Sequence, residues 1–222
     1  GGIPALLYGA PAERGYLFLH GQMGRKEEAE AFAQVVCPKG YQALSIDLPA
    51  HGERQGRGEK LIPWVAVPDI RAAWEWAEHR WNTVSLRANS IGAYIAMLAV
   101  DRLDRALLVS PILDMEGLIL TMMGWAGVTE EELRERGEIA TAFGETLSWE
   151  YLCWVREHPV HSWNCPVRIL YGSEDSMTPR RTVEEYVRRP GARLTVLEGG
   201  EHWLHTPEQL AALREWEKSS CC

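Results

Sequence analysis

The stretch that decides the fold reads Arg87-Ala88-Asn89-Ser90-Ile91-Gly92-Ala93. Residues 83–86 before it are short, β-branched and apolar, as in a buried strand, and residues 91–100 are rich in Ala, Leu, Ile and Met, as in a helix. Ser90 therefore stands at a sharp strand-to-helix turn, with the small residues Ala88 and Gly92 two positions before and after it. Bulkier side chains at these two positions would collide with the adjacent strand and helix.

A serine at such a turn is placed for nucleophilic chemistry. Its hydroxyl projects at the top of the sheet beside a helix N-terminus, where free N–H groups and the helix dipole favour a developing negative charge. The alternative is an ordinary strand-to-helix turn in which Ser90 only caps the helix. The rest of the chain has to decide between the two.

Four further loops with polar residues follow predicted strands. Open parallel sheets build their sites at the carboxyl ends of strands, where these loops lie. In chain order they are His20-Gly21-Gln22-Met23-Gly24 after strand 15–19, Asp47-Leu48-Pro49-Ala50-His51-Gly52 after strand 41–46, Gly172-Ser173-Glu174-Asp175 after strand 167–172, and Gly199-Gly200-Glu201-His202-Trp203 after strand 193–197.

These five motifs in this order resemble the α/β-hydrolase superfamily, in particular small serine esterases and monoacylglycerol-lipase-like hydrolases with a short helical cap. The family pattern G-x-S-x-G has Ala88 in place of its first Gly. The resemblance implies an α/β fold with a mostly parallel central sheet flanked by helices, and a helical cap inserted after the strand that ends near Ser110. It divides the chain into a core of residues 1–111 and 167–222 and a cap of residues 112–166.

The resemblance also implies roles for individual residues. Ser90, Asp175 and His202 match the nucleophile, acid and base in the order that this superfamily uses. The backbone N–H groups of Gln22 and Ile91 match the oxyanion hole, which needs two fixed donors aimed at the developing oxyanion. His20, Asp47 and His51 are interpreted as structural residues of their loops.

Alternatives remain for two members of the triad. Asp114, after the preceding strand (105–111), could be the acid, because some members of the superfamily place it there. Glu174 is the neighbouring competitor, but the spacing from Gly172 favours Asp175. His205 is the alternative base, although Thr206-Pro207 after it indicates the start of a C-terminal helix.

The region 112–166 is predicted as several helices. Residues 117–128 carry no charge, and flexible methionines and aromatic rings suit an adaptable apolar pocket for an acyl or aryl group. The candidate pocket residues are Met122, Met123, Trp125 and Trp203. The alternative is that these residues only bury the cap against the core. The remaining regular segments are predicted as an edge strand (3–8), a helix (25–36), a helix that starts at Pro68, and a helix (182–188).

Composition sets outer limits on function. With 222 residues, 46% hydrophobic and 24% charged, the chain has the size and composition of a single globular domain. Its net charge of −8 argues against nucleic acid or an anionic membrane as a partner. No basic-then-apolar signal peptide opens the sequence, and no apolar run is long enough to span a bilayer.

The five cysteines are odd in number and form no C-x-x-C pair. This favours a reducing compartment, hence a cytoplasmic location, and argues against a disulfide scaffold or a zinc site. The adjacent Cys221-Cys222 is expected on a frayed tail and is given no function.

We therefore expect a serine hydrolase that cleaves a small-molecule carboxylic ester with a small to medium acyl or aryl group. The reaction would pass through an acyl-enzyme and need neither a metal nor an organic cofactor. A thioesterase or a C–C hydrolase would use the same triad. A proline-type peptidase would need acidic cap residues to bind a free amino terminus, and a non-catalytic protein of this fold would hold a small ligand without turning it over.

Overall fold

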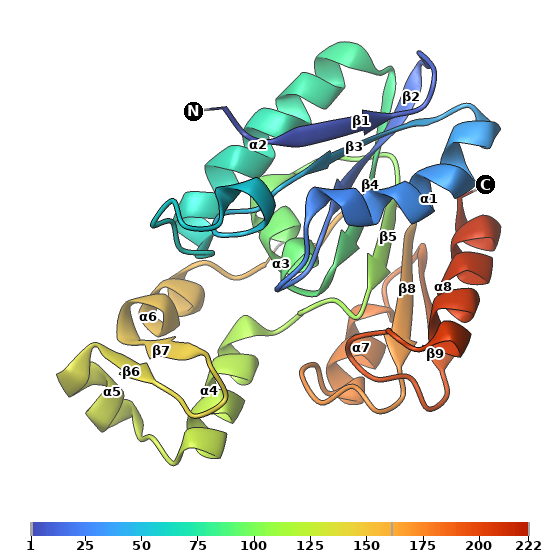
Figure 1. Ribbon diagram of the computed structural model, residues 1–222. Helices are drawn as coiled ribbons and strands as arrows, with labels where there is room; N and C mark the ends of the chain where they lie inside the picture. The colour runs from blue at the N-terminus through green and yellow to red at the C-terminus, as the bar shows by residue number, and fades with distance from the viewer. Residues whose placement is uncertain (1, 161, 222) are drawn as a thin grey trace.

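A seven-stranded sheet forms the centre of the computed structural model, which describes residues 2–160 and 162–221 (Figure 1). The strand order is β1-β3-β2-β4-β5-β8-β9. β1 pairs antiparallel with β3, and the other neighbours pair in parallel. The strands are β1 (Ala5–Tyr8), β2 (Arg14–Leu19), β3 (Gln42–Ile46), β4 (Thr83–Asn89), β5 (Ala106–Val109), β8 (Val167–Gly172) and β9 (Ala192–Leu197). The predicted fold class is confirmed.

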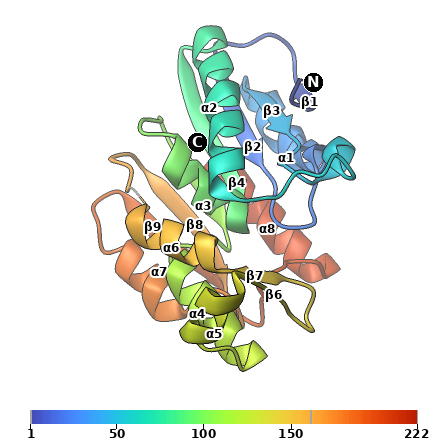
Figure 2. The ribbon, with the colours of Figure 1, turned by 90° about the vertical axis from the view of Figure 1, so that its left-hand side faces the viewer.

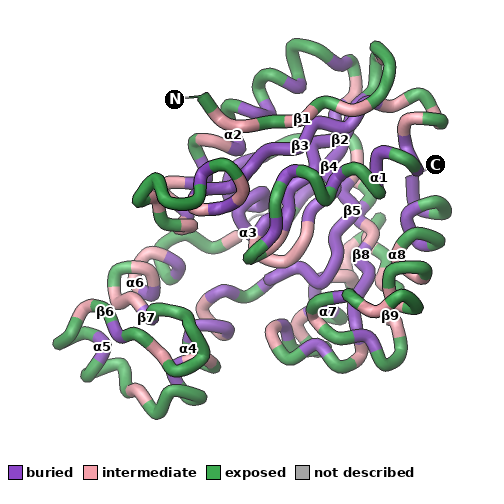
Figure 3. Tube along the Cα trace, viewed as in Figure 1, coloured by how far each residue is buried: buried purple, intermediate pink, exposed green. Residues whose placement is uncertain are grey.

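Two hydrophobic clusters cover the two faces of the sheet. Tyr16 and Phe18 of β2 pack toward α1 (Ala29–Val36) and α8 (Pro207–Ser220). Leu17 of the same strand belongs to the cluster beneath α2 (Pro63–Arg80) and α3 (Ser90–Ala99), because side chains alternate along a strand. The central strands are therefore buried on both faces (Figure 3), and their sequences read as continuous apolar runs.

The segment between β5 and β8 lies at the end of the sheet to which β4 and β5 point (Figures 1 and 2). It contains α4 (Met115–Ala126), α5 (Glu130–Arg136) and α6 (Trp149–Glu157), as several helices were predicted. It also contains a small antiparallel hairpin of β6 (Glu138–Ala140) and β7 (Thr146–Ser148), which was not predicted. Strands of three residues are too short to show a periodicity of two.

Two predictions about helices are wrong in detail. α2 begins at Pro63, and Pro68 lies inside it. Both prolines fit a helix start, but the Ile62 carbonyl already accepts bonds from Val65 and Ala66, so the helix is under way before Pro68. Pro68 then costs the helix the bond that its missing N–H would have donated. The helix predicted at 182–188 is α7 (Arg180–Tyr186).

The C-terminal tail is not frayed over its described residues. α8 extends to Ser220, and Cys221 is 1% exposed, packed in the same cluster as Tyr16. Burial raises the pKa of the Cys221 thiol to about 11. Cys222 lies outside the described residues.

Short 3-10 turns occur at Lys26–Glu28, Cys37–Lys39 and Gly52–Arg54. Over the described ranges, no helix is both long and apolar enough to cross a membrane.

Candidate active site

The turn between β4 and α3 carries Ser90 in a strained conformation. Its φ of 46° lies in the left-handed region, which L residues other than glycine seldom adopt. The loop after β2 lies directly beside it, because a Cβ added to Gly21 would lie 3.3 Å from the Ser90 Cβ. Ser90 is only partly buried and is therefore within reach of a bound molecule.

Two hydrogen bonds of 2.8 Å join the three predicted triad side chains. Ser90 Oγ lies 2.8 Å from His202 Nε2, and His202 Nδ1 lies 2.8 Å from Asp175 Oδ2. The Asp175 side chain is fully buried, whereas 18% of the His202 side chain is exposed. The second carboxylate oxygen of Asp175 accepts bonds from the backbone N–H groups of Met177 and Thr178, at 2.8 and 3.1 Å. These bonds fix the carboxylate in the orientation that faces His202.

Close contact between two glycines brings Asp175 and His202 together. Their loops follow the paired strands β8 and β9, where Gly172 lies opposite Leu197. A Cβ on Gly172 would lie 2.3 Å from the Gly200 carbonyl oxygen, and that same oxygen accepts the Glu174 N–H at 2.8 Å. Only glycine fits at position 172, and this explains why a glycine precedes Asp175 by three residues.

The structure joins none of the three alternative residues to the Ser90–His202–Asp175 hydrogen bonds. Asp114 caps the N-terminus of α4 by accepting the Gly117 N–H at 2.8 Å. Glu174 is exposed. His205 is half-exposed, stacks on the Trp203 ring at a centroid distance of 4.8 Å, and has Nδ1 3.3 Å from Glu201 Oε2.

Two histidines support the loop that carries Gln22. His20 Nε2 accepts the Leu48 N–H at 3.0 Å, and His51 Nε2 accepts the Met23 N–H at 2.9 Å. Because both Nε2 atoms are acceptors, each ring carries its proton on Nδ1, which donates to a backbone carbonyl at 2.8 Å. Burial lowers the pKa of His20 to about 4, so this ring stays neutral.

Asp47 stabilises the base of the same loop. Its buried carboxylate accepts the Lys26 ammonium at 3.0 Å and the N–H groups of Lys26 and Glu53 at 2.9 and 3.0 Å. The structural roles expected for Asp47, His20 and His51 agree with these contacts.

Neither of the two candidate oxyanion N–H groups has an acceptor among residues 2–160 and 162–221. Ile91 is the second residue of α3, so its N–H has no acceptor within the helix. In the loop after β2, His51 takes the Met23 N–H, and no acceptor for the Gln22 N–H is found among the described residues. A substrate carbonyl oxygen bound here would find these two donors unpaired.

The comparisons with known proteins show the family and the fold. The family model described as "Alpha/beta hydrolase family" matches residues 16–213. The chain belongs to the alpha/beta hydrolase family. No curated protein matches it.

Several solved structures share the fold at low identity. A ferulic acid complex of Est1E from Butyrivibrio proteoclasticus is 19% identical, with a TM-score of 0.78 over 98% of this chain and 93% of that chain. Alpha/beta hydrolase domain-containing protein 10 from mouse is 16% identical, with a TM-score of 0.76 over 98% and 92%. The Pyrococcus furiosus esterase Pf2001 is 17% identical, with a TM-score of 0.66 over 98% and 84%.

The candidate pocket residues of this alpha/beta hydrolase fall into two groups. Met123 is 3% exposed, and Met122 is partly buried; both pack in the core cluster. This placement fits the alternative interpretation, in which these residues bury the inserted segment against the core. Trp125 is half-exposed and packs edge-on against Phe143, with ring centroids 6.0 Å apart. Trp203 is 74% exposed and directly follows His202.

Two apolar residues near the site were missed from the sequence. Met23 is 90% exposed and directly follows Gln22, and Phe143 is exposed in the turn between β6 and β7. The side-chain amide nitrogen of Gln22, Nε2, donates to Glu145 Oε1 at 3.4 Å, and this contact places the β6–β7 turn beside the loop after β2. Met23 has no periodic neighbours in the sequence, and its place next to Gln22 was the one signal for it.

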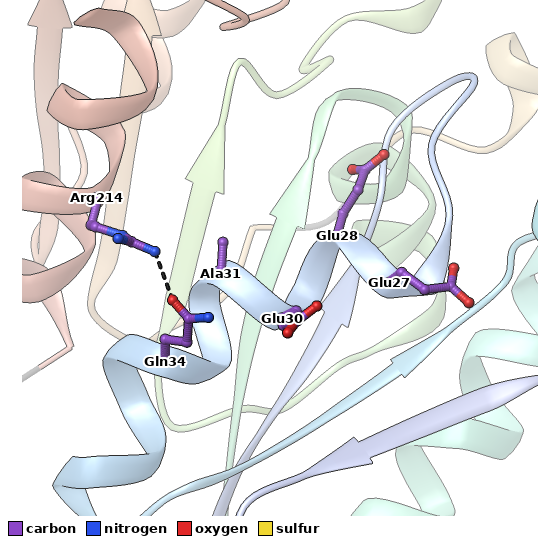
Figure 4. A pocket seen from close by; sticks show the side chains of 6 residues that line it. All are labelled: Glu27, Glu28, Glu30, Ala31, Gln34 and Arg214. Atoms are coloured by element: carbon purple, nitrogen blue, oxygen red, sulfur yellow. Dashed lines mark hydrogen bonds between the residues drawn. The ribbon is translucent and has the colours of Figure 1, made fainter. Parts of the chain in front are cut away.

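A shallow hollow on the surface is a different feature (Figure 4). Its volume is about 400 Å³, and it lies between α1 and α8, where Arg214 donates to Gln34 at 2.8 Å. Its lining residues are Glu27, Glu28, Glu30, Ala31, Gln34 and Arg214. None belongs to the triad, and we assign the hollow no role in binding.

Proposed function

We propose that the protein is a serine hydrolase that cleaves carboxylic esters, with Ser90 as nucleophile, His202 as base and Asp175 as the residue that orients the base. The observation that carries this proposal is the chain of two 2.8 Å hydrogen bonds from Ser90 Oγ through the His202 ring to Asp175. This arrangement activates a serine hydroxyl for acyl transfer.

The geometry supports a sequence of two acyl transfers. His202 Nε2 removes the proton of Ser90 Oγ as the oxygen attacks the ester carbonyl, and the Gln22 and Ile91 N–H groups stabilise the oxyanion. Each such donor contributes roughly 3–4 kcal/mol to lowering the barrier. The tetrahedral intermediate collapses to an acyl-enzyme while His202 passes its proton to the departing alcohol. Water, deprotonated by His202, then releases the acid and restores Ser90.

Asp175 contributes through orientation and charge. Its Oδ2 accepts the Nδ1 proton of His202, so that Nε2 is left free to act as the base. The same carboxylate stabilises the imidazolium that forms during each transfer.

We further propose that residues 112–166 form a cap over a core of residues 1–111 and 167–222. Two polar contacts between them support this: Gln22 with Glu145, and Lys60 Nζ with Glu138 Oε1 at 2.7 Å. The exposed side chains of Met23, Trp125, Phe143 and Trp203 favour an ester with an apolar acyl or aryl group. Esterases among the similar structures favour an ester over a thioester or a peptide. The described cysteines are free, which is consistent with a cytoplasmic protein.

The decisive experiment is labelling with a fluorophosphonate probe, together with turnover of p-nitrophenyl esters. We expect wild-type protein to be labelled and Ser90→Ala to be unlabelled, inactive and folded. Ser110→Ala is the matched control, because Ser110 also directly follows a strand (β5) and has a positive φ of 44°, but its buried hydroxyl has no partner among the described residues. A folded wild type that is neither labelled nor active would refute the proposal.

A further inference from the structure

Arg87 is a buried charge that the reaction above does not use. Among the described residues it is the largest that is fully buried, and only 2% of its side chain is exposed. A buried guanidinium is costly unless its charge and its N–H groups are satisfied. Arg87 lies in β4, three residues before Ser90, so the reason for its burial bears on the nucleophile turn.

Two hydrogen bonds and two rings surround the guanidinium. Nε donates to Glu217 Oε1 of α8 at 2.9 Å, and Nη1 donates to Asn89 Oδ1 at 2.6 Å. The guanidinium carbon lies 5.4 Å from the centre of the Phe18 ring and 5.9 Å from that of Phe32. Glu217 therefore balances the charge, and Asn89 accepts a second N–H.

The bond to Asn89 acts at the point where β4 becomes α3. Arg87 and Asn89 lie on the same face of the strand, because side chains alternate, and Ala88 between them faces the other cluster. Asn89 keeps extended backbone angles, with φ −107° and ψ 139°, whereas the next residue, Ser90, has φ 46°. A strained residue persists where its surroundings fix it firmly. Through its hydrogen bond to Asn89, Arg87 supplies such a constraint at the residue directly before the strained Ser90.

We infer that Arg87 and Asn89 are positioning residues for the nucleophile, and that Glu217 holds Arg87 in place from the C-terminal helix. The inference rests on the proposed function. The pair fixes Asn89 at the end of the sheet, and this sets the direction of Ser90 Oγ and of the Ile91 N–H. Displacement of a catalytic group by about 1 Å can cost on the order of 100-fold in rate.

Asn89→Ala removes the acceptor and leaves the Arg87–Glu217 ion pair in place. We expect kcat to fall about 10- to 100-fold and KM to change less than about 2-fold, because the acyl group binds elsewhere. The rate of fluorophosphonate inactivation should fall in parallel with kcat. The apparent pKa of the pH–rate profile should stay unchanged, since the His202–Asp175 bond is not altered. The kcat values are calculated per active site titrated with the probe, so that unfolded protein does not lower them.

A double variant separates positioning from stability. Arg87→Met alone leaves the Glu217 carboxylate buried without its cation and can unfold the protein. Arg87→Met with Glu217→Gln removes both charges, so we expect a Tm close to that of the wild type. If Arg87 acts by positioning, the double variant has the same low kcat as Asn89→Ala. If its role is only structural, the double variant regains wild-type kcat with its Tm, and the inference is overturned.

The control is Ser45→Ala in β3. Its buried hydroxyl has no partner among the described residues, so its removal should change neither Tm nor kcat. An unlabelled wild type would reject the proposed function itself. If the wild type is labelled but Asn89→Ala has the same kcat as the wild type, the positioning role is rejected and the proposed function still stands.

Discussion

The α carbon of Gly92 faces the carbonyl group of His20 so closely that a Cβ on residue 92 would lie 2.4 Å from the carbonyl oxygen. The first turn of α3 therefore rests directly on the end of β2. This contact fixes the distance between the two segments that carry Ile91 and Gln22. It explains in physical terms why the position two after Ser90 must be glycine here.

Gly92→Ala should destabilise the fold and separate the two proposed oxyanion donors, the N–H groups of Gln22 and Ile91. We expect a loss of about 1–3 kcal/mol in the free energy of unfolding, from forced backbone movement, and at least a tenfold drop in esterase kcat. Denaturant unfolding and p-nitrophenyl acetate turnover measure the two effects. Gly124→Ala in α4 is the control: a Cβ there meets no atom within 4 Å, so up to about 1 kcal/mol of stabilisation is expected. Equal behaviour of the two variants would contradict the account.

Asp175→Asn should reduce kcat by about 10⁴-fold, because an amide favours the wrong tautomer of the neighbouring histidine. Asp114→Asn should keep near-normal kcat, since Asp114 only caps α4. Steady-state rates per labelled site check both variants. A near-normal rate in Asp175→Asn with a large loss in Asp114→Asn would assign the acid to Asp114 instead.

The exposed apolar residues near the site should set chain-length preference. Met23→Ser and Phe143→Ser should each lower kcat/KM for p-nitrophenyl octanoate about 5- to 30-fold, since a lost apolar contact costs roughly 1–2 kcal/mol. Turnover of the acetate ester, which is too short to reach them, should stay within about 2-fold. Leu7→Ser and Leu210→Ser are controls with comparable exposure to Phe143 on other surfaces. Equal losses for acetate and octanoate would argue against a role in binding the chain.

His20 should make the fold sensitive to acid. Its pKa is about 4 in the folded protein and 6.5 as the ordinary value, so the folded state resists protonation. Stability is unaffected above pH 6.5 and falls as the pH drops toward 4, because the unfolded chain takes up the proton first. At pH 5 the loss from this group is about 2 kcal/mol. Denaturant unfolding at pH 7.5 and 5.0 should show a smaller difference between the two pH values in His20→Asn than in the wild type, and an identical difference would exclude the effect.

Much of the site could be predicted because its signals are local. Each loop with Ser90, Asp175 or His202 directly follows a strand, and parallel pairing brings the ends of such strands to one edge. The structure accordingly brings these three side chains together. The glycines at 92 and 172 could be recognised for the same reason, since each lies within a few residues of the side chain it helps to place.

The remainder depends on contacts between distant residues. Arg87 looks like any charged residue in the sequence, and its partner Glu217 is 130 positions away. The burial of Cys221 follows from packing beside Tyr16, which no local pattern reveals. The start of α2 at Pro63 was missed because either proline could have begun the helix, and the β6–β7 hairpin was missed because three-residue strands are too short to show an alternating pattern.

The segment between β5 and β8 is also a connection within the sheet. The two strands are parallel neighbours, with Ala106 opposite Val167, so any chain leaving β5 must travel back to the far end of the sheet before β8 begins. Trp163 anchors the return by donating to the Val100 carbonyl at 2.6 Å. Doubling the length of a flexible connection costs only about 0.6 kcal/mol in closure entropy. Evolution or an engineer can therefore exchange this crossover for one of different length and lining while the sheet stays the same, and under the proposed function such an exchange would change what reaches Ser90.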